Sequence, residues 1–345
     1  MNIKKIGMTA LAASLVSVSA NAAELSVSGG ASINMNQYTA GADLNYGHSF
    51  TMGNALVFSG SGELENGLNV SVSFELDEGS NSGNRATTAT AAGTAETTTA
   101  PASTDVFDNH SVSVGNDTLG TLIFSGHGGN SATTKINTTA AGDIWDAFDG
   151  ALMSTVATGV GISEAGAGDD SFFYTAPSLM DGLDIFASYN PSNTTETDES
   201  AIGYGVTYTG VDGLTVSYAQ ADVKTNSSAT SGENTAISAK YAYGPVTVAY
   251  TINEHDEGTN TNDQDTTSYA VSYTLTEEIS VSYGVEELER GGAPDADAEY
   301  SKISASYTSG GVTLSAAYSE ADNIDYSNNS NADQEYIFLG ASFAF

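Results

Sequence analysis

Apolar and polar residues alternate along many short segments of this chain, as in β-strands whose two faces differ. The clearest segment places Leu68, Val70, Val72, Phe74 and Leu76 between Asn69, Ser71, Ser73 and Glu75. Such a period of two predicts a strand with one apolar face. The expected strands are 25–33, 55–64, 68–76, 106–115, 119–125, 171–176, 183–189, 201–209, 214–221, 235–243, 246–253, 267–275, 279–287, 300–308, 312–319 and 335–345. The pattern therefore predicts an all-β fold of about 16 strands, an even number.

The connections between these segments alternate in length. Tight turns such as Asn66-Gly67, Gly244-Pro245 and Gly310-Gly311 join the strands of each pair, and Gly and Asn supply the positive φ angles that tight turns use. Long loops rich in Asn, Ser, Thr and Asp separate the pairs. Short turns at one end and long loops at the other are typical of a transmembrane antiparallel β-barrel. A soluble β-sandwich also alternates apolar and polar residues, so alternation alone leaves that alternative open.

The chain ends on an apolar strand with no polar tail. Ile337, Leu339, Ala341, Phe343 and Phe345 share one face. In a closed barrel the last strand pairs with the first, which leaves no open edge. We therefore expect Phe343 and Phe345 to lie at a seam formed against Leu25, Val27 and Ile33.

Composition narrows the function. The 345 residues include no Cys, and 43 acidic residues against 8 basic ones give a net charge of −35. The lack of Cys excludes thiol catalysis and Cys-based zinc sites, and the charge excludes nucleic-acid binding as the main function. His48, His110, His127 and His255 show no zinc-binding spacing, and no Ser lies in a nucleophile-elbow motif, so an enzyme is not expected.

The N-terminus predicts export. Lys4 and Lys5 precede an apolar run over 6–18, and Ala20-Asn21-Ala22 has the small-x-small form of a cleavage site. The run is shorter than the ~20 residues of a spanning helix. We therefore expect a cleaved signal peptide at 1–22 and a barrel at 23–345 in the outer membrane.

The loop at about 127–168 is the longest interruption. Asp143, Asp146 and Asp149 are spaced by three, so one helical turn would place them on one face. Ile144 and Phe148, four apart, could hold such a turn against the barrel wall. Folded inward, the loop would narrow the lumen with these carboxylates and that of Glu164. An acidic surface loop is the alternative.

Taken in order, these features resemble one protein family. The signal, the hairpin rhythm, the third loop after the segment 112–125 and the terminal Phe345 are similar to Gram-negative general-diffusion porins, in particular alphaproteobacterial (Rhodobacter-type) porins of sixteen strands. The resemblance implies a homotrimer joined through the early strands, and a third loop folded inward as the eyelet. It also implies that the outer-membrane barrel assembly machinery recognises Phe345, so that deleting this residue impairs assembly more than conductance.

The chain departs from that family in its basic residues. Porins of this type place arginines opposite the acidic loop, often where Gly126-His127 stands here. This chain has only Arg85 and Arg290, both in expected loops, while strand parity points Lys240 and Lys302 into the lumen as its only basic residues. Fixed carboxylates concentrate cations in a confined lumen. The sequence therefore predicts passive diffusion of small hydrophilic solutes and ions with a preference for cations.

Carboxylates also cluster in the outer loops, where a hard cation has suitable ligands. Asp263, Asp265, Asp295 and Asp297 are the candidates for binding Ca²⁺ or Mg²⁺, which would bridge the barrel to outer-membrane lipid and lipopolysaccharide phosphates. Solvated acidic loops are the alternative, and diffusion itself requires no cofactor. For the whole chain, the alternative function is a non-conducting acidic surface β-protein, either an adhesin or a structural outer-membrane protein.

Overall fold

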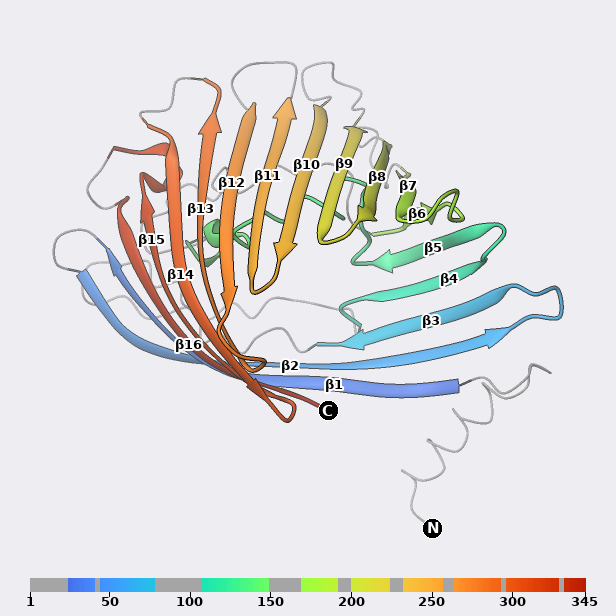
Figure 1. Ribbon diagram of the computed structural model, residues 1–345, viewed down its shortest axis with the longest axis horizontal. Coiled ribbons are helices and arrows are strands. Elements are labelled where there is room, and N and C mark those ends of the chain that lie inside the picture. The colour runs from blue at the N-terminus through green and yellow to red at the C-terminus, as the bar shows by residue number, and fades with distance from the viewer. Residues whose placement is uncertain are drawn as a thin grey trace, which may run out of the picture.

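The computed structural model describes residues 24–40, 44–77, 107–148, 169–191, 200–223, 232–256, 263–292, 296–328 and 332–345. In these ranges, sixteen antiparallel strands form one closed barrel (Figure 1), each strand pairing with its neighbours in sequence and the last with the first. The predicted all-β barrel and its strand number are confirmed. Among the described residues, no helix is long and apolar enough to cross a membrane. The expected signal peptide at 1–22 lies outside these ranges.

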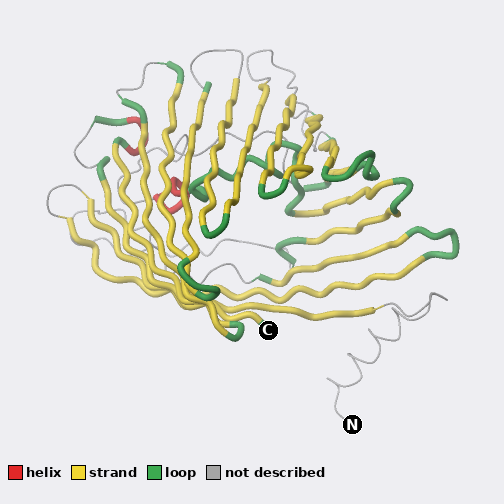
Figure 2. Tube along the Cα trace, in the orientation of Figure 1, coloured by secondary structure: helices red, strands yellow, loops and turns green. Residues whose placement is uncertain are grey.

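The strands have the following bounds: β1 (Glu24–Ala40), β2 (Leu44–Glu63), β3 (Asn69–Leu76), β4 (His110–Asn116), β5 (Gly120–His127), β6 (Ser171–Thr175), β7 (Leu183–Asn190), β8 (Ala201–Val211), β9 (Leu214–Val223), β10 (Gly232–Tyr243), β11 (Val246–Asp256), β12 (Gln264–Thr274), β13 (Ile279–Arg290), β14 (Ala298–Ser309), β15 (Val312–Asp322) and β16 (Gln334–Ala344). Two short 3₁₀ turns, η1 (Ile144–Phe148) and η2 (Ile324–Tyr326), complete the described elements. Figure 2 shows the short turns gathered at one end of the barrel.

The first two strands are longer than expected. The expected strands end at 33 and begin again at 55, but β1 continues to Ala40 and β2 already begins at Leu44. The segment 44–53 shows no clear alternation, yet Phe50 lies opposite Met35 and Met52 lies opposite Ile33. Pairing with the long β1 satisfies the backbone of this segment, and this tertiary constraint outweighs its weak pattern.

The two faces of the barrel differ as the alternation predicts. Val248 and Val271 lie opposite each other on β11 and β12, with 46% and 43% of their surface exposed on the outer face. On the inner face, hydroxyls meet across neighbouring strands, as in Ser282 and Ser304, whose Oγ atoms are 2.7 Å apart. The barrel therefore turns an apolar surface outward and a hydroxyl-rich surface inward.

The seam closes at the last residue of the chain. The Gly29 N–H donates to the Phe345 oxygen at 2.9 Å, and the Phe345 N–H donates to the Gly29 oxygen at 3.0 Å. A Cβ atom at position 29 would lie 2.7 Å from Leu56 Cδ2 and 3.0 Å from Phe345 Cε2, so glycine leaves room for the terminal ring. The seam is continuous from this pair to the far end of β1.

The expected seam partners are corrected in part. Ile33 pairs with Ala341, as expected. Leu25 and Val27 extend past the end of β16 and pair only with β2, opposite Gly60 and Phe58. The strand β1 is therefore longer than its partner at the turn end of the barrel.

Deleting Phe345 is expected to weaken closure, because both hydrogen bonds to Gly29 are lost and each contributes about 1 kcal/mol. Phe345→Ala keeps the two backbone bonds and loses only the ring contact, so we expect a smaller loss. Refolding into detergent micelles, followed by the heat-dependent shift in gel mobility, measures the folded fraction. Equal folded fractions for the deletion and the wild type would contradict the role of this pair.

Candidate functional site

The loop that follows β5 lies inside the barrel, against its inner wall. Its backbone N–H groups donate to wall hydroxyls in succession. The Ala132 N–H donates to Ser188 Oγ on β7 at 2.9 Å, the Ala140 N–H donates to Thr251 Oγ1 on β11 at 2.9 Å, and the Ala141 N–H donates to Ser268 Oγ on β12 at 3.0 Å. The described part of the loop, 128–148, therefore follows the wall and is fastened through its backbone. The expected inward fold is observed.

A buried carboxylate on β13 holds the next part of this loop. Glu286 has none of its surface exposed. Its Oε1 accepts the Ile144 N–H at 2.8 Å and also the Thr139 hydroxyl, and its Oε2 accepts the Trp145 N–H at 3.1 Å. All three partners donate, so both oxygens of the Glu286 carboxylate act as acceptors. Glu286 is the main polar anchor of η1, which lies within the ring of strands in Figure 1.

Thr139 and Asp143 extend this anchor within the loop. The Asp143 N–H donates to Thr139 Oγ1 at 2.7 Å, and the Thr139 N–H donates to Asp143 Oδ1 at 2.9 Å. Asp143 has a φ of 48°, a left-handed conformation that Asp tolerates better than most residues. One carboxylate oxygen of Asp143 thus binds the loop's own backbone.

Apolar contacts hold the far end of the described loop. Ile144 and Phe148 are buried, as expected from their spacing, and pack with Leu288 and Tyr300 of the wall. The Tyr38 hydroxyl of β1 donates to the Ala147 oxygen at 2.7 Å. The loop therefore reaches from β5 past β7, β11, β12 and β13 to β1.

A second apolar contact holds the beginning of the loop. Ala132 packs with Phe173 and Phe186, whose rings lie on β6 and β7. Lys135 places its Nζ 5.3 Å from the centre of the Phe173 ring, within the range of a cation–π contact. The expectation that Lys240 and Lys302 are the only basic residues of the lumen is therefore wrong.

The other described basic residues lie on β10, β13 and β14. Lys302 donates to the Gly142 oxygen at 3.4 Å, and Lys240 lies on the inner face of β10, exposed. Arg290 is the last residue of β13 rather than part of a loop, and its guanidinium lies 5.8 Å from the centre of the Tyr326 ring. In the described ranges, no Lys or Arg occurs on β1 to β6.

The predicted constriction residues are thus placed in part. Asp143 and Lys302 lie near each other beside Gly142, Asp146 is exposed within η1, and Lys240 lies on a different strand. Asp149 and Glu164 fall outside the described residues. The roles of these side chains in narrowing the pore stay predictions.

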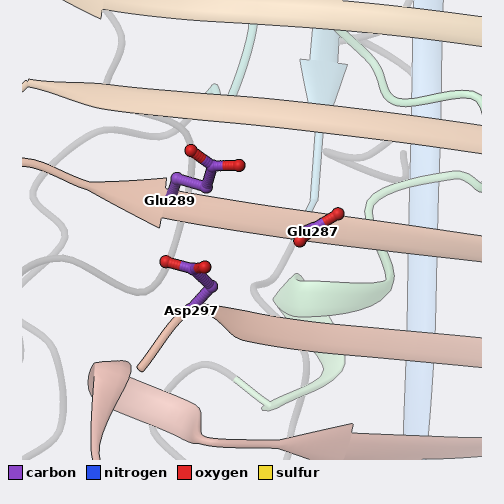
Figure 3. A group of neighbouring side chains, drawn as sticks. All are labelled: Glu287, Glu289 and Asp297. Atoms are coloured by element: carbon purple, nitrogen blue, oxygen red, sulfur yellow. The ribbon is translucent and has the colours of Figure 1, made fainter. Parts of the chain in front are cut away.

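The predicted metal ligands lie at the loop end of the barrel. Asp265 is part of β12, Asp263 and Asp297 lie just before β12 and β14, and Asp295 is outside the described ranges. The structure brings Asp297 together with two residues that the sequence did not single out, Glu287 and Glu289 (Figure 3). Their carboxylate oxygens lie within 4.8 Å of one another, and all three residues are exposed.

Comparison with known proteins identifies this architecture. A family model described as Gram-negative porin matches residues 7–345. The chain belongs to the Gram-negative porin family. No curated protein sequence matches it. The protein is therefore an outer-membrane β-barrel, and the barrel of a porin is a diffusion channel. By the rule for such barrels, the short turns face the periplasm and the loops face the outside.

Solved porin structures share this fold. An anion-selective porin from Comamonas acidovorans has a TM-score of 0.64 at 14% identity, over 94% of this chain and 100% of its own. Salmonella typhi OmpF, in complex with daunomycin, gives 0.64 at 16% identity, over 94% and 98%. A variant of the Rh. blastica porin gives 0.61 at 15% identity, over 93% and 100%. Such low identities show the fold alone, and the alphaproteobacterial subgroup is not confirmed.

The wall anchors of this porin were missed from sequence. One feature of the sequence could have pointed to Glu286. This acidic residue shares a strand face with the small residues Ser280, Ser282 and Gly284. An acid with this parity faces the lumen. Its partners lie more than 140 residues earlier in the chain, so only the structure shows what it binds.

Glu286→Gln is expected to loosen the loop of this porin. The amide would turn an N–H₂ group toward one of the three donors, and a hydrogen bond to a charged group contributes about 1.5–3 kcal/mol. We expect more frequent current fluctuations in single-channel recordings. Glu287→Gln is the matched control, because it removes the same charge one residue away on the exposed outer face. Equal fluctuation rates in the two variants would contradict the anchoring role.

Proposed function

We propose that this porin conducts small hydrophilic solutes and ions by passive diffusion, with a preference for cations. The excess of acidic residues carries the proposal: 43 acidic residues stand against 8 basic ones. The fold permits either preference, since the similar Comamonas porin is anion-selective. The charge within and around the lumen therefore decides whether the channel prefers cations or anions. The proposed function involves no chemical reaction and requires no cofactor.

The arrangement of basic residues supports a weak transverse field. Lys302 lies beside Gly142, on the same side as Glu286 of β13. Lys135 lies across the barrel, against the rings of Phe173 on β6 and Phe186 on β7. The described strands β1 to β9 carry no Lys or Arg, so Lys135 of the loop is the one described basic side chain on that wall. The carboxylates then set the sign of the potential, because a single Lys and no cluster of described basic residues opposes them.

Reversal potentials across planar bilayers in a KCl gradient test the cation preference. We expect a reversal potential whose sign shows a preference for K⁺. Its magnitude should fall as ionic strength rises, because salt screens fixed charges. Lys240→Gln, which removes an exposed lumenal cation, is expected to increase the preference, whereas Asp117→Asn at a periplasmic turn serves as a small-effect control. A potential near zero, or one directed toward Cl⁻, contradicts the proposal.

We propose further that the protein is a homotrimer joined through β1 to β8. The observation is the distribution of outward acids: within the described residues, none faces outward on these strands, whereas β9 to β16 carry many. The outer face of β1 and β2 exposes Val27, Phe50 and Met52 by 57%, 69% and 51%. Three highly acidic barrels can approach each other only through an uncharged face. In the bilayer recordings, such an assembly closes in three equal current steps.

The loop end of β9 to β16 supports a proposal on divalent ions and lipid. Carboxylates stand directly opposite each other on neighbouring strands, on the outer face: Glu254 and Asp265, Asp265 and Glu289, Glu287 and Glu299, Glu299 and Asp322, and Glu320 and Glu335. Like charges in such pairs destabilise a sheet. We propose that Ca²⁺ or Mg²⁺ screens these pairs and bridges them to lipopolysaccharide phosphates.

Partial desolvation and neighbouring carboxylates also raise the pKa of an acidic residue just outside the strands at this end of the barrel. Asp77 lies just after β3. Partial desolvation is the main cause that raises its pKa, and the nearby carboxylates of Asp108 and Glu75 raise it further. Repulsion of this kind is relieved by bound cations.

Chelator at low ionic strength is expected to lower the melting temperature of the wild type. The triple variant Glu287→Gln, Glu289→Gln, Asp297→Asn should show a smaller shift, since the three clustered outer-face carboxylates are neutralised. A control triple variant at the turns, Asp117→Asn, Asp212→Asn and Glu277→Gln, removes the same charge and should keep the full shift. Melting temperatures unmoved by chelator would contradict divalent binding.

We also propose that barrel assembly machinery recognises the terminal Phe345. Support comes from the exposure of this residue, 74% of whose surface is accessible, while its backbone completes the seam. Assembly of Phe345→Ala in cells, compared with its refolding in detergent, separates recognition from stability: a defect confined to cells supports recognition, and equal behaviour in both contradicts it.

A further inference from the structure

The periplasmic half of the lumen is lined mainly by hydroxyl groups. Inward hydroxyls pair across neighbouring strands around the barrel: Ser71 with Ser113 at 2.5 Å, Thr207 with Ser217 at 2.9 Å, and Ser280 with Ser306 at 2.8 Å. These pairs offer hydrogen-bond donors and acceptors without net charge. This surface can exchange hydrogen bonds with neutral polar solutes as well as with water.

The ring of Phe338 interrupts this hydroxyl surface on β16. Phe338 alternates on β16 with Ile337 and Leu339, which are exposed on the outer face by 37% and 46%, so Phe338 points into the lumen. A Cβ atom at Gly340 would lie 2.6 Å from Phe338 Cζ. The tip of the ring therefore reaches two residues along its own strand. The ring therefore lies over Gly340 on the inner side of the wall.

Uncharged polar groups flank the ring. In the register of β1 and β16, Asn36 lies opposite Phe338, and Asn34 lies opposite Gly340. The Oδ1 atom of Asn34 would be 2.9 Å from the same Cβ position, so this amide and the ring tip meet over one glycine. On the other side, β15 places Ala317 opposite Phe338. No charged residue is a strand partner of Phe338.

The position along the pore is also defined. Tyr336, the next inward residue of β16 toward the loop end, has its ring centre 6.1 Å from that of Phe148 in the inward loop. The Tyr336 hydroxyl donates to Asn36 Oδ1 at 2.7 Å. Phe338 therefore lies directly on the periplasmic side of the loop, where a solute emerges from the narrowed part of the lumen.

We propose that the Phe338 ring and the Asn34 amide form a subsite for neutral pyranose sugars. A pyranose has an apolar C–H face that matches an aromatic ring and a rim of hydroxyls that matches amides and serines. Sites of this kind join an apolar surface to a few placed polar groups. This proposal rests on the proposed channel function and adds to it a class of solute that binds within the pore.

The test uses planar-bilayer recordings in KCl with maltotriose as the neutral probe. We expect maltotriose to reduce the current of the wild type, and Phe338→Leu to bind it about three- to ten-fold more weakly, because leucine keeps apolar bulk but lacks the ring face. Gly340→Ala keeps the phenylalanine but displaces its ring, and should weaken binding as well. Ser342→Ala is the matched control: it changes an inward residue of the same strand away from the ring and should bind maltotriose as the wild type does.

The outcomes separate this inference from the channel function. Normal KCl conductance with no maltotriose block in the wild type, or with equal block in Phe338→Leu and the wild type, overturns the sugar subsite and leaves the channel intact. Absence of KCl conductance in the wild type overturns both. Block that is lost in Phe338→Leu and Gly340→Ala but kept in Ser342→Ala supports the subsite.

Discussion

Closure of the backbone hydrogen-bond ladder is the constraint on which this porin depends. Inside a bilayer no water is available to an unpaired N–H or C=O group, so every strand needs a partner on each side. β1 and β16 meet this need for each other, down to the reciprocal pair between Gly29 and Phe345. This closure also fixes the parity of all strands, because a slip of one residue would exchange the apolar and hydroxyl faces.

The inward loop is held by hydrogen bonds to which the wall and the loop contribute different groups. The wall contributes side chains, such as Thr251, Ser268 and Glu286, and the loop contributes mainly its backbone N–H groups. A segment bound in this way keeps its path whatever side chains it carries toward the water. Buried backbone groups are satisfied, and the remaining side chains are available to set the character of the pore.

Charge is distributed unevenly around and along the barrel. Outward carboxylates gather at the loop end of β9 to β16, whereas the described strands β1 to β8 present no outward acid. In the lumen, the described basic residues lie beside the loop or on β10, β13 and β14, and the periplasmic half is mainly hydroxylated. Closure makes this separation possible, because strand parity and strand order together assign each residue a face and a sector.

The sequence alone determined the barrel and its strand number, and the resemblance to porins implied the inward third loop. Alternation over segments such as 68–76 is a local signal, and a strand that borders lipid must express it. The spacing of Ile144 and Phe148 also predicted their packing correctly. The pattern failed over 44–53, where pairing with β1 outweighs a weak local signal. Only the tertiary structure decided that Glu286 binds η1, that Lys135 enters the lumen and that Glu287 and Glu289 meet Asp297. The contacts of Glu286 join residues more than 140 positions apart, and no local pattern records a distant partner. Glu287 and Glu289 meet Asp297 across the loop between β13 and β14.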